Sequence, residues 1–342
     1  MDLSITFYDI HRCGYYDWNK SDPEFGRIDS ILDELKFWTE GKPLKKTCTY
    51  EIAENSNILK TYCFDICCSK DKKDWLITTW NEVPSIDGKM ASVNGDNIVG
   101  SASVKLSSLP AGGIPGYPTY FWIIPDKNKY ATVTEVSNLN GNTAFKVFMN
   151  EFVAKFTRFV VLNEDADVDH SISGFRKSKE DEPSLLYAKF LAYMIRNKSQ
   201  INLIRNNCNK IRKVIRKNKL ETETNAQGVR DLISMLSMGL YQNELKKDEY
   251  KVKIEIDYQP TLEELDGIID AWMESHDNST LWDNVGFQFI GEGLKTHWLS
   301  HSIARYNGDF KVEIKDGNVI ESASLLGKLV LNKQVIMRVI DE

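Results

Sequence analysis

The sequence predicts an α+β protein of two domains, and three features lead to this prediction. Pairs of apolar segments joined by short polar turns indicate antiparallel sheet. Apolar residues at three- and four-residue spacing indicate helices that cover such a sheet. One long polar stretch divides the chain, whose 342 residues amount to about two domains at roughly 150 residues each.

The N-terminal half is expected to be an antiparallel sheet with covering helices. Residues 3–7 alternate apolar and polar side chains, which is typical of a half-buried strand. Helices are expected over 27–38 and 144–156, where one face is apolar. Two antiparallel hairpins are expected at 59–80 and 117–136, each joined by a short charged turn. The second helix has the more aromatic face and is expected to lie on the sheet.

The domain boundary is placed in a polar stretch that lacks apolar periodicity. The predicted parts are a domain over 1–163, a linker over 164–183 and a second domain over 184–342. The second domain is expected to be helical over 184–240 and mixed α+β over 250–342. Its helices are expected at 184–195, 199–219 and 227–238.

The mixed region is expected to begin with a strand over 251–257. A helix should follow from Thr261, because Glu263 and Glu264 stand in its first turn. A hairpin is expected over 310–321, where Asp316-Gly317 suits a type I′ turn.

The clearest local feature is a basic stretch in an acidic chain. The formal net charge is -6, so attraction to a polyanion must come from a local patch. Between Arg196 and Lys219 there is no acidic residue. The basic residues of this stretch, which are the candidate nucleic-acid-binding residues, are Arg196, Lys198, Arg205, Lys210, Arg212, Lys213, Arg216, Lys217 and Lys219.

The basic stretch is predicted to form one cationic amphipathic helix. Its apolar residues recur at intervals of 3, 4, 3 and 4, at Ile201, Ile204, Cys208, Ile211 and Ile215. Such spacing places them on one side of a helix and leaves the other side to Lys and Arg. Lys and Arg displace condensed counterions from phosphates, so four or five contacts would give a slope of log affinity against log salt of about -4.

Two other interpretations of the basic stretch remain open. Its charged face is either solvated or paired with an acidic surface of the same protein or of another subunit. A suitable partner lies in residues 255–283, which lack Lys and Arg. The acidic residues there are Glu255, Asp257, Glu263, Glu264, Asp266, Asp270, Glu274, Asp277 and Asp283. This segment could also screen the basic helix, or bind the basic surface of a partner protein.

Aromatic residues in the loop expected after the first strand offer a second contact. Tyr15, Tyr16 and Trp18 could stack on bases, because an aromatic ring accepts any base. We favour the alternative that they anchor the loop on the sheet.

Catalytic and metal sites are not favoured by the sequence, and no catalytic residue, metal ligand or cofactor is assigned. Three aspartates stand on alternate positions, as Ca²⁺ or Mg²⁺ ligands can, at Asp165, Asp167 and Asp169, and His170 follows them, but the Gly and Glu of an EF-hand are missing. His297 and His301 lack the Glu of a zincin motif. Common signatures of nucleotide hydrolysis, α/β-hydrolase chemistry and zinc proteolysis are absent from the sequence.

A metal-dependent nuclease is the alternative from the enzyme class. Glu313-Ile-Lys315 is expected on a strand and Asp283 before another, an arrangement that could hold a metal and stabilise developing charge. The Glu-x-Lys pattern is weak evidence for a nuclease, because it also begins at Glu34, Glu40, Glu244 and Glu249.

The expected compartment is the cytoplasm. The six cysteines show no C-x-x-C spacing and are interpreted as reduced thiols. The first residues lack the basic and apolar regions of a signal peptide, and no apolar window approaches 18 residues. Membrane insertion is therefore not expected.

The order of elements resembles that of the RexA-type phage-exclusion sensor proteins. The likeness lies in the strand Gly116-Tyr-Pro-Thr-Tyr-Phe-Trp-Ile-Ile124, the strand over 130–136 and the aromatic helix over 145–156. The helix over 28–38, the hairpin about Lys70 and the segment Arg176-Lys-Ser-Lys-Glu-Asp181 before the basic region follow the same order. The resemblance extends over about the first 215 residues, and the strands from Lys251 onward depart from it.

The resemblance implies a prokaryotic antiviral protein that binds DNA or protein–DNA complexes, forms homodimers and triggers a separate effector in abortive infection. It brings no catalytic residues. The leading hypothesis is thus a nucleic-acid-binding sensor, with DNA favoured, that acts through the basic helix. A defence nuclease and a protein-interaction or inhibitor subunit using residues 255–283 are the alternatives.

Overall fold

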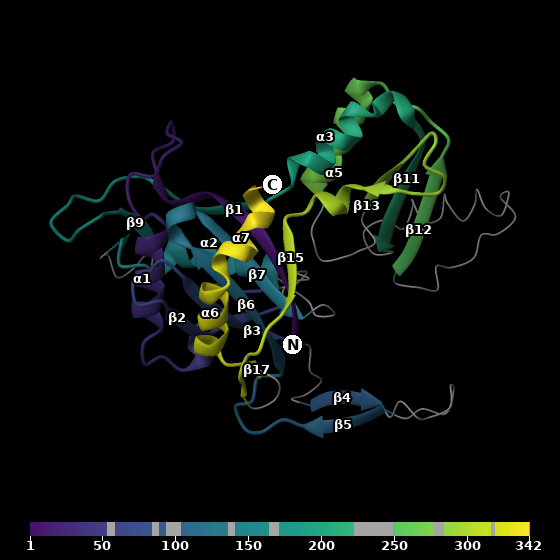
Figure 1. Cartoon of the computed structure of the whole chain (residues 1–342). Coiled ribbons are helices and arrows are strands. Elements are labelled where there is room, and N and C mark those ends of the chain that lie inside the picture. Colours follow the sequence, from purple (N-terminus) through teal and green to yellow (C-terminus); the bar gives the residue numbers. More distant parts are fainter. Residues whose placement is uncertain are drawn as a thin grey trace, which may run out of the picture. The chain divides into compact units, whose positions relative to one another are not determined.

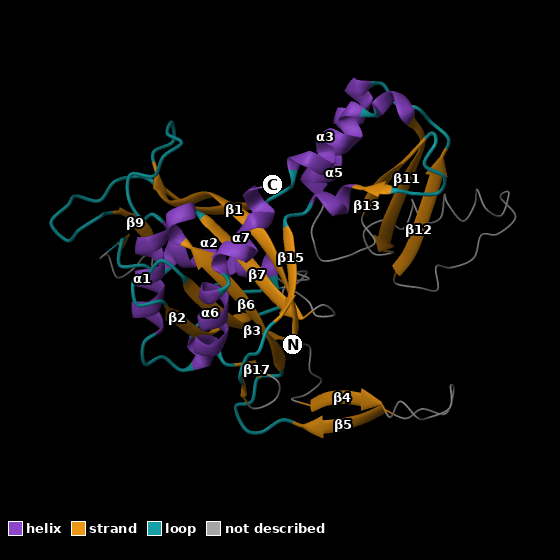
Figure 2. Ribbon diagram, viewed as in Figure 1, coloured by secondary structure: helices purple, strands orange, loops and turns teal. Residues whose placement is uncertain are grey.

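The computed structural model describes residues 1–52, 59–83, 89–93, 104–135, 141–163, 171–221, 249–275, 284–315 and 319–341. Helices and strands occur together throughout (Figure 2), and every strand pair in these ranges is antiparallel. This confirms the predicted α+β class. The chain divides into a first unit, Met1–Ile195 with Arg305–Arg338, and a second unit, Arg196–Ala304 with Val339–Glu342.

The first unit is built on a seven-stranded sheet. Its strands are β1 (Asp2–Tyr16), β2 (Thr61–Cys68), β3 (Trp75–Glu82), β6 (Gly116–Ile124), β7 (Lys129–Glu135), β10 (Tyr187–Met194) and β15 (Arg305–Asp309). Their order is β10-β1-β7-β6-β3-β2, and β15 also pairs with β1. Both hairpins expected over 59–80 and 117–136 are therefore present.

Strand β1 is the longest strand of this sheet and is shared by three neighbours. It pairs with β7 through residues 3–9, with β15 through residues 2–6 and with β10 through residues 8–16. Because a strand has only two edges, β15 and β10 lie along the same edge, one after the other. The strand expected over 3–7 thus extends to Tyr16.

Helices α1 (Ile28–Thr39) and α2 (Asn142–Lys155) cover one face of this sheet, as expected (Figure 1). Their buried side chains join those of β3 and β6 in one hydrophobic core. Phe145 of α2 stacks on Phe121 of β6 with ring centroids 3.8 Å apart. Aromatic contact therefore fixes α2 to the sheet.

Two consecutive helices follow β17 (Val319–Ile320), namely α6 (Ser322–Leu331) and α7 (Lys333–Asp341). Helix α6 contacts β2 and β3 and buries Leu325 and Leu329. Its first residue, Ser322, shares a hydrogen bond of 2.9 Å with Thr78, which neighbours the core residue Ile77 on β3 and so points to the opposite face. Lys333 reaches the buried carboxylate of Asp74 at 2.9 Å. The sheet is thus covered by helices on both faces.

Three short strand pairs and two single turns of 3-10 helix lie in the same unit. The pairs are β4 (Lys89–Val93) with β5 (Val104–Ser108), β8 (Val160–Leu162) with β9 (Ile172–Phe175), and β16 (Ile314–Lys315) with β17 (Val319–Ile320). The turns are Leu44–Lys46 and Pro125–Lys127. The hairpin expected over 310–321 is confirmed in its strand pairing, while its turn at Asp316-Gly317 lies outside the described residues.

In the residues that the structure describes, the second unit is a four-stranded sheet with two helices on one face. The strands are β11 (Ile211–Glu221), β12 (Glu249–Ile256), β13 (Asn284–Phe289) and β14 (His297–Trp298), in the order β12-β11-β13-β14. Helices α3 (Lys198–Asn206) and α5 (Leu262–Ser275) share a core with β13. Short 3-10 turns at Cys208–Lys210 and Leu299–Ser302 connect these elements.

Helix α5 begins where the sequence predicts. The Thr261 hydroxyl accepts a hydrogen bond from the Glu264 backbone N–H at 3.2 Å, and the Glu264 carboxylate accepts one from the Thr261 N–H at 2.8 Å. This reciprocal pair is a capping box, which satisfies donors that a helix N-terminus leaves unpaired. The strand expected over 251–257 is also present, as β12.

The predicted helix over 199–219 is wrong beyond Asn206. Helix α3 ends there, where the Asn207 side chain donates to the Leu203 carbonyl at 2.9 Å, and the chain continues as strand β11. Ile211, Val214 and Ile215 are β-branched and favour strand. A spacing of four keeps two residues on one side of a helix and also of a regular strand, so the apolar stripe did not distinguish the two.

The predicted helix over 184–195 is also wrong, because this segment is strand β10. Its core-facing residues alternate with a period of two, at Leu186, Ala188, Phe190, Ala192 and Met194. That period is the pattern of a strand. The helix expected over 227–238 lies outside the described residues.

The predicted domain limits differ from the observed units. Strand β10 lies within the predicted domain over 184–342 but pairs with β1, which places it in the first unit. Residues 305–338 return to the first unit through β15 and α6. Part of the expected linker over 164–183 forms strand β9. No helix among the described residues is long and apolar enough to cross a membrane.

Candidate nucleic-acid interface

The basic stretch does not occupy one face of one helix. Lys198 and Arg205 stand on α3, Lys210 stands in a 3-10 turn, and Arg196 precedes α3. The remaining members lie on strand β11, at Arg212, Lys213, Arg216, Lys217 and Lys219. The structure therefore distributes the predicted site over a helix, a turn and a strand of the second unit.

Several of these residues are paired inside the second unit. Arg205 Nε lies 2.6 Å from Asp266 Oδ1. Lys213 Nζ lies 2.9 Å from a carboxylate oxygen of Glu255 and 3.8 Å from one of Asp257. The acidic segment over 255–283 thus supplies partners to the basic stretch, as one of the open interpretations proposed.

Of the other residues of the basic stretch, some contact protein groups and some are exposed to solvent. The Arg212 guanidinium donates to the Gln288 amide oxygen at 3.1 Å and to the Gly293 carbonyl at 2.7 Å. The Arg196 guanidinium carbon lies 4.2 Å from the centroid of the Trp272 ring. Lys198 and Lys210 are exposed. Most of the basic residues of the stretch lie on strand β11.

Strand register gathers lysines on one face of the second sheet. Lys217 stands opposite Lys253 of β12, and Lys219 stands opposite Lys251. Residues opposite each other in an antiparallel pair share a face, and so do residues two apart along a strand. We define the lysine face as Lys213, Lys217, Lys251 and Lys253.

The lysine face is turned away from the helices of the unit. Val214 packs against the core that α3 and α5 share, and it stands opposite Phe287 of that core. Lys213 adjoins Val214 in the strand and therefore belongs to the opposite face. Lys251 and Lys253 are exposed, and Lys217 is half-buried.

The lysine face follows the period of a strand and not the helical spacing from which one basic helix is predicted. Lys251-Val-Lys253-Ile-Glu255 alternates charged and apolar residues, and Lys213, Lys217 and Lys219 are separated by even numbers. Both patterns have the period of a strand. The pairing of the two strands, which are far apart in the sequence, has no comparable signal.

Glu255 partly neutralises this surface. Its carboxylate lies 2.6 Å from Lys253 Nζ and 2.9 Å from Lys213 Nζ. Hydrogen bonds from Lys253 and then Lys213 lower the pKa of Glu255 from 4.5 to about 2. The hydrogen bond with Glu255 raises the pKa of Lys213. One carboxylate thus bridges two members of the lysine face.

The bridge predicts a stability change in acid. The folded state holds the Glu255 pKa near 2, below its ordinary value of 4.5, so the bridge stabilises the folded state above pH 4.5 and is lost as the pH falls toward 2. We expect Glu255→Gln to remove this part of the acid dependence. Urea unfolding of both proteins at several pH values measures it. Parallel stability profiles from pH 5 to pH 2 would contradict the assignment.

An aromatic ring lies among the lysines. Lys217 Nζ is 4.4 Å from the centroid of the Trp298 ring, a cation–π contact. Trp298 stands opposite Gly286 of β13, where a Cβ atom would lie 2.6 Å from the indole and 2.5 Å from Thr296 Cγ2. The missing side chain of Gly286 therefore makes room for Trp298 against the sheet.

Substitution of Gly286 tests this packing. We expect Gly286→Ala to lower the free energy of unfolding by about 2 kcal/mol, because Trp298 and Thr296 must move. Gly267→Ala is the matched control in helix α5, where a Cβ atom meets nothing within 4 Å and Ala should add up to about 1 kcal/mol. Urea unfolding measures both, and equal stability changes would contradict the packing.

The aromatic residues near the first strand have different environments. Tyr15 is fully buried in the core of the first unit, and its hydroxyl donates to the Val153 carbonyl at 2.7 Å. Tyr16 is also buried, so base stacking by these two residues is excluded. Both residues lie in strand β1 and not in the predicted loop, so they are buried as residues of the sheet itself and do not anchor a loop on it. Trp18 is exposed.

The candidate histidine pair does not share a helix face. His297 is buried in β14, and its Nε2 lies 2.6 Å from a Glu292 carboxylate oxygen. His301 is exposed in a 3-10 turn. Asp165, Asp167, Asp169 and His170 lie outside the described residues. In the ranges that are described, no three His, Cys, Asp or Glu side chains are placed to hold a metal ion.

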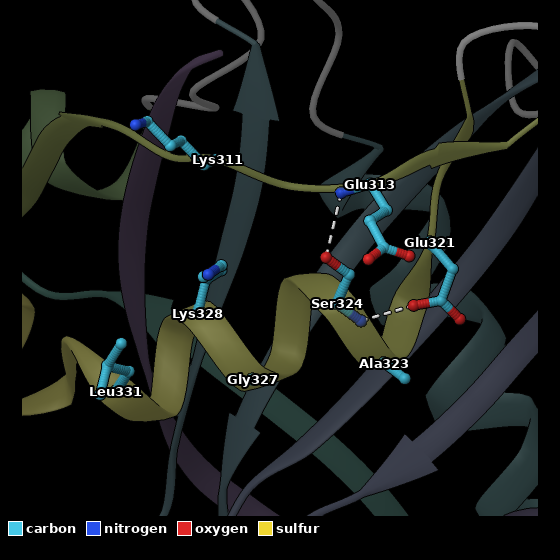
Figure 3. A pocket seen from close by; sticks show the side chains of 8 residues that line it. All are labelled: Lys311, Glu313, Glu321, Ala323, Ser324, Gly327, Lys328 and Leu331. Atoms are coloured by element: carbon cyan, nitrogen blue, oxygen red, sulfur yellow. Dashed lines mark hydrogen bonds between the residues drawn. The ribbon is translucent and has the colours of Figure 1, made fainter.

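The candidate nuclease residues are only partly described. Asp283 lies outside the described residues, and Glu313 precedes β16 rather than standing on it. Lys315 lies 3.4 Å from Glu321. Glu313 lines a cavity of about 520 Å³ beside α6, where its backbone N–H donates to Ser324 Oγ at 3.0 Å (Figure 3). Helix α6 is capped by the Glu321 side chain, which accepts a hydrogen bond from the Ser324 backbone N–H, and Glu313 lacks the strand position that a nuclease site would need.

Comparison with protein families, with curated proteins and with solved structures finds no match to this chain. The lysine face of the second unit and the predicted resemblance therefore remain the grounds for a functional proposal.

Proposed function

We propose that this protein binds nucleic acid through the lysine face of its second unit. The observation that carries the proposal is the register of β11 and β12, which sets Lys217 opposite Lys253 and Lys219 opposite Lys251. Like charges directly opposite each other destabilise a sheet. A polyanion laid over them offsets this repulsion.

The chemistry of the lysine face suits a phosphate backbone. Lys is a flexible point charge that contacts phosphates without regard to sequence. Lysines two residues apart on one face of a strand are about 7 Å apart, which is about twice the rise of roughly 3.4 Å per phosphate along one strand of DNA. Trp298 adds an aromatic ring beside Lys217 of the lysine face.

The broader proposal is a DNA-binding sensor of an antiviral defence system that acts with a separate effector. It is supported by the resemblance of the first 215 residues to the RexA-type sensors and by the lysine face. The predicted basic helix does not support this proposal, because its second half forms strand β11. A second copy of this chain and an effector protein remain the proposed protein partners.

Salt dependence of binding tests the proposal. We expect the affinity for a DNA duplex of about 30 base pairs to fall with salt at a slope of about -4 in log units, the value for four or five phosphate contacts. Fluorescence anisotropy between about 50 and 200 mM salt measures it. Absence of binding at the lowest salt would contradict the proposal. Cleavage of plasmid DNA in the presence of Mg²⁺ would favour the nuclease instead.

A further inference from the structure

We infer that the first unit carries a separate site for a nucleobase that bears a phosphate group, at the exposed side chain of Trp18. Trp18 follows strand β1 and is 73% exposed. Its ring centroid lies 5.1 Å from that of Tyr187, the first residue of β10. An exposed indole held against a second ring is a surface on which a planar ligand can stack.

The ring of Tyr187 is itself held in place from behind. Tyr187 stands opposite Tyr16 of β1, and the two rings stack with centroids 5.6 Å apart. The Tyr16 hydroxyl accepts a hydrogen bond from the Cys13 backbone N–H at 2.7 Å. Trp18 therefore rests on a pair of rings fixed by the sheet.

Cationic groups accompany these rings. The Arg12 guanidinium carbon lies 5.3 Å from the Tyr16 ring centroid and 5.9 Å from the Tyr187 ring centroid, and Arg12 donates a hydrogen bond to the Tyr187 hydroxyl. Lys189 lies two residues beyond Tyr187 and therefore belongs to the same face of β10. Stacked rings beside Arg and Lys suit a ligand that is planar at one end and anionic at the other.

A nucleotide has this chemistry, and so does each unit of a single strand. Bases of a duplex are stacked on one another and cannot reach the indole without leaving the helix. The site should thus prefer single-stranded over duplex nucleic acid, unlike the lysine face, which contacts only the backbone. It involves no residue of the lysine face and does not rest on the proposed function.

The test measures binding of a fluorescein-labelled oligothymidylate of about 15 nucleotides and of thymidine monophosphate to the full chain. It uses the Lys217→Glu, Lys253→Glu background, so that the lysine face contributes little. We expect Trp18→Ala to weaken oligonucleotide binding roughly tenfold, the size of one lost base–aromatic stack. Trp18→Phe should restore most of the affinity, because it keeps an aromatic ring.

Phe37→Ala is the matched control. Phe37 of α1 is 55% exposed and lies 4.2 Å from the Arg158 guanidinium carbon, so it too is an exposed ring beside a cation. We expect it to leave binding unchanged. Thermal unfolding of each variant verifies that the exposed substitutions leave the fold intact.

Two results support the site and distinguish its ligands. Trp18-dependent binding of the oligonucleotide alone identifies a single strand, and Trp18-dependent binding of thymidine monophosphate identifies a free nucleotide. Equal affinities of Trp18→Ala and the parent protein for both probes overturn the inference, as does an equal loss in Phe37→Ala. Failure of the lysine face would appear differently, as duplex binding that is unchanged by the Lys217 and Lys253 substitutions.

Discussion

Reversing Lys217 and Lys253 together to Glu is expected to weaken DNA duplex binding by roughly a hundredfold at moderate salt, about tenfold for each reversed charge. These residues are opposite each other across β11 and β12 and are central to the lysine face. Each reversal removes one phosphate contact and adds a repulsive one. The salt slope should fall by about 2, at roughly 0.9 for each lost contact. Anisotropy titrations at several salt concentrations measure both quantities.

The control for this prediction is Lys177→Glu with Lys179→Glu in the first unit. Both of these lysines are exposed, and the pair changes the net charge by the same amount. It should alter affinity by no more than a few fold, since neither lysine belongs to the lysine face. An equal loss in the control would mean that net charge, rather than the lysine face, governs binding. An unchanged salt slope in the Lys217 and Lys253 variant would contradict the phosphate contacts.

Phe145→Ala is expected to lower the free energy of unfolding of the first unit by about 4 kcal/mol. Phe145 is 1% exposed and stacks on Phe121, and it also meets Phe190 with ring centroids 6.1 Å apart. Truncation therefore leaves a cavity between α2 and two strands of the sheet. Urea unfolding monitored by circular dichroism measures the loss.

Phe37→Ala serves as the comparison here, because its ring is more than half exposed on α1. It should change the free energy of unfolding by less than about 1 kcal/mol. A loss below about 1 kcal/mol for Phe145→Ala would show that α2 is not held to the sheet by this ring.

Elements with a strong local pattern were predictable from the sequence. The hairpin strands β2 and β3 are joined by a short turn, so their pairing follows from neighbouring residues. Helix α5 begins at a Thr and Glu three residues apart, which is a local signal for a helix start. In these cases the interactions that form the element lie within the segment itself.

The candidate site was predictable in composition but not in form. The count of Lys and Arg between Arg196 and Lys219 identified the correct region. Its conformation depended on whether Ile211 and Ile215 pack as helix or strand, and a spacing of four is compatible with either. The segment is a strand because β11 pairs with β12, and this contact joins distant parts of the chain.

Strand β1 has a consequence for how the chain is made. Its residues 2–6 pair with β15, and the side chains of Thr6 and Arg305 are joined by a hydrogen bond of 3.1 Å across a separation of 299 residues. The second unit is inserted in the sequence between β10 and β15, which both complete the same edge of β1. During synthesis residues 2–6 of that edge stay unpaired until β15 has left the ribosome. Closure of the first sheet is therefore a late event, and the nascent protein needs protection from aggregation until it occurs.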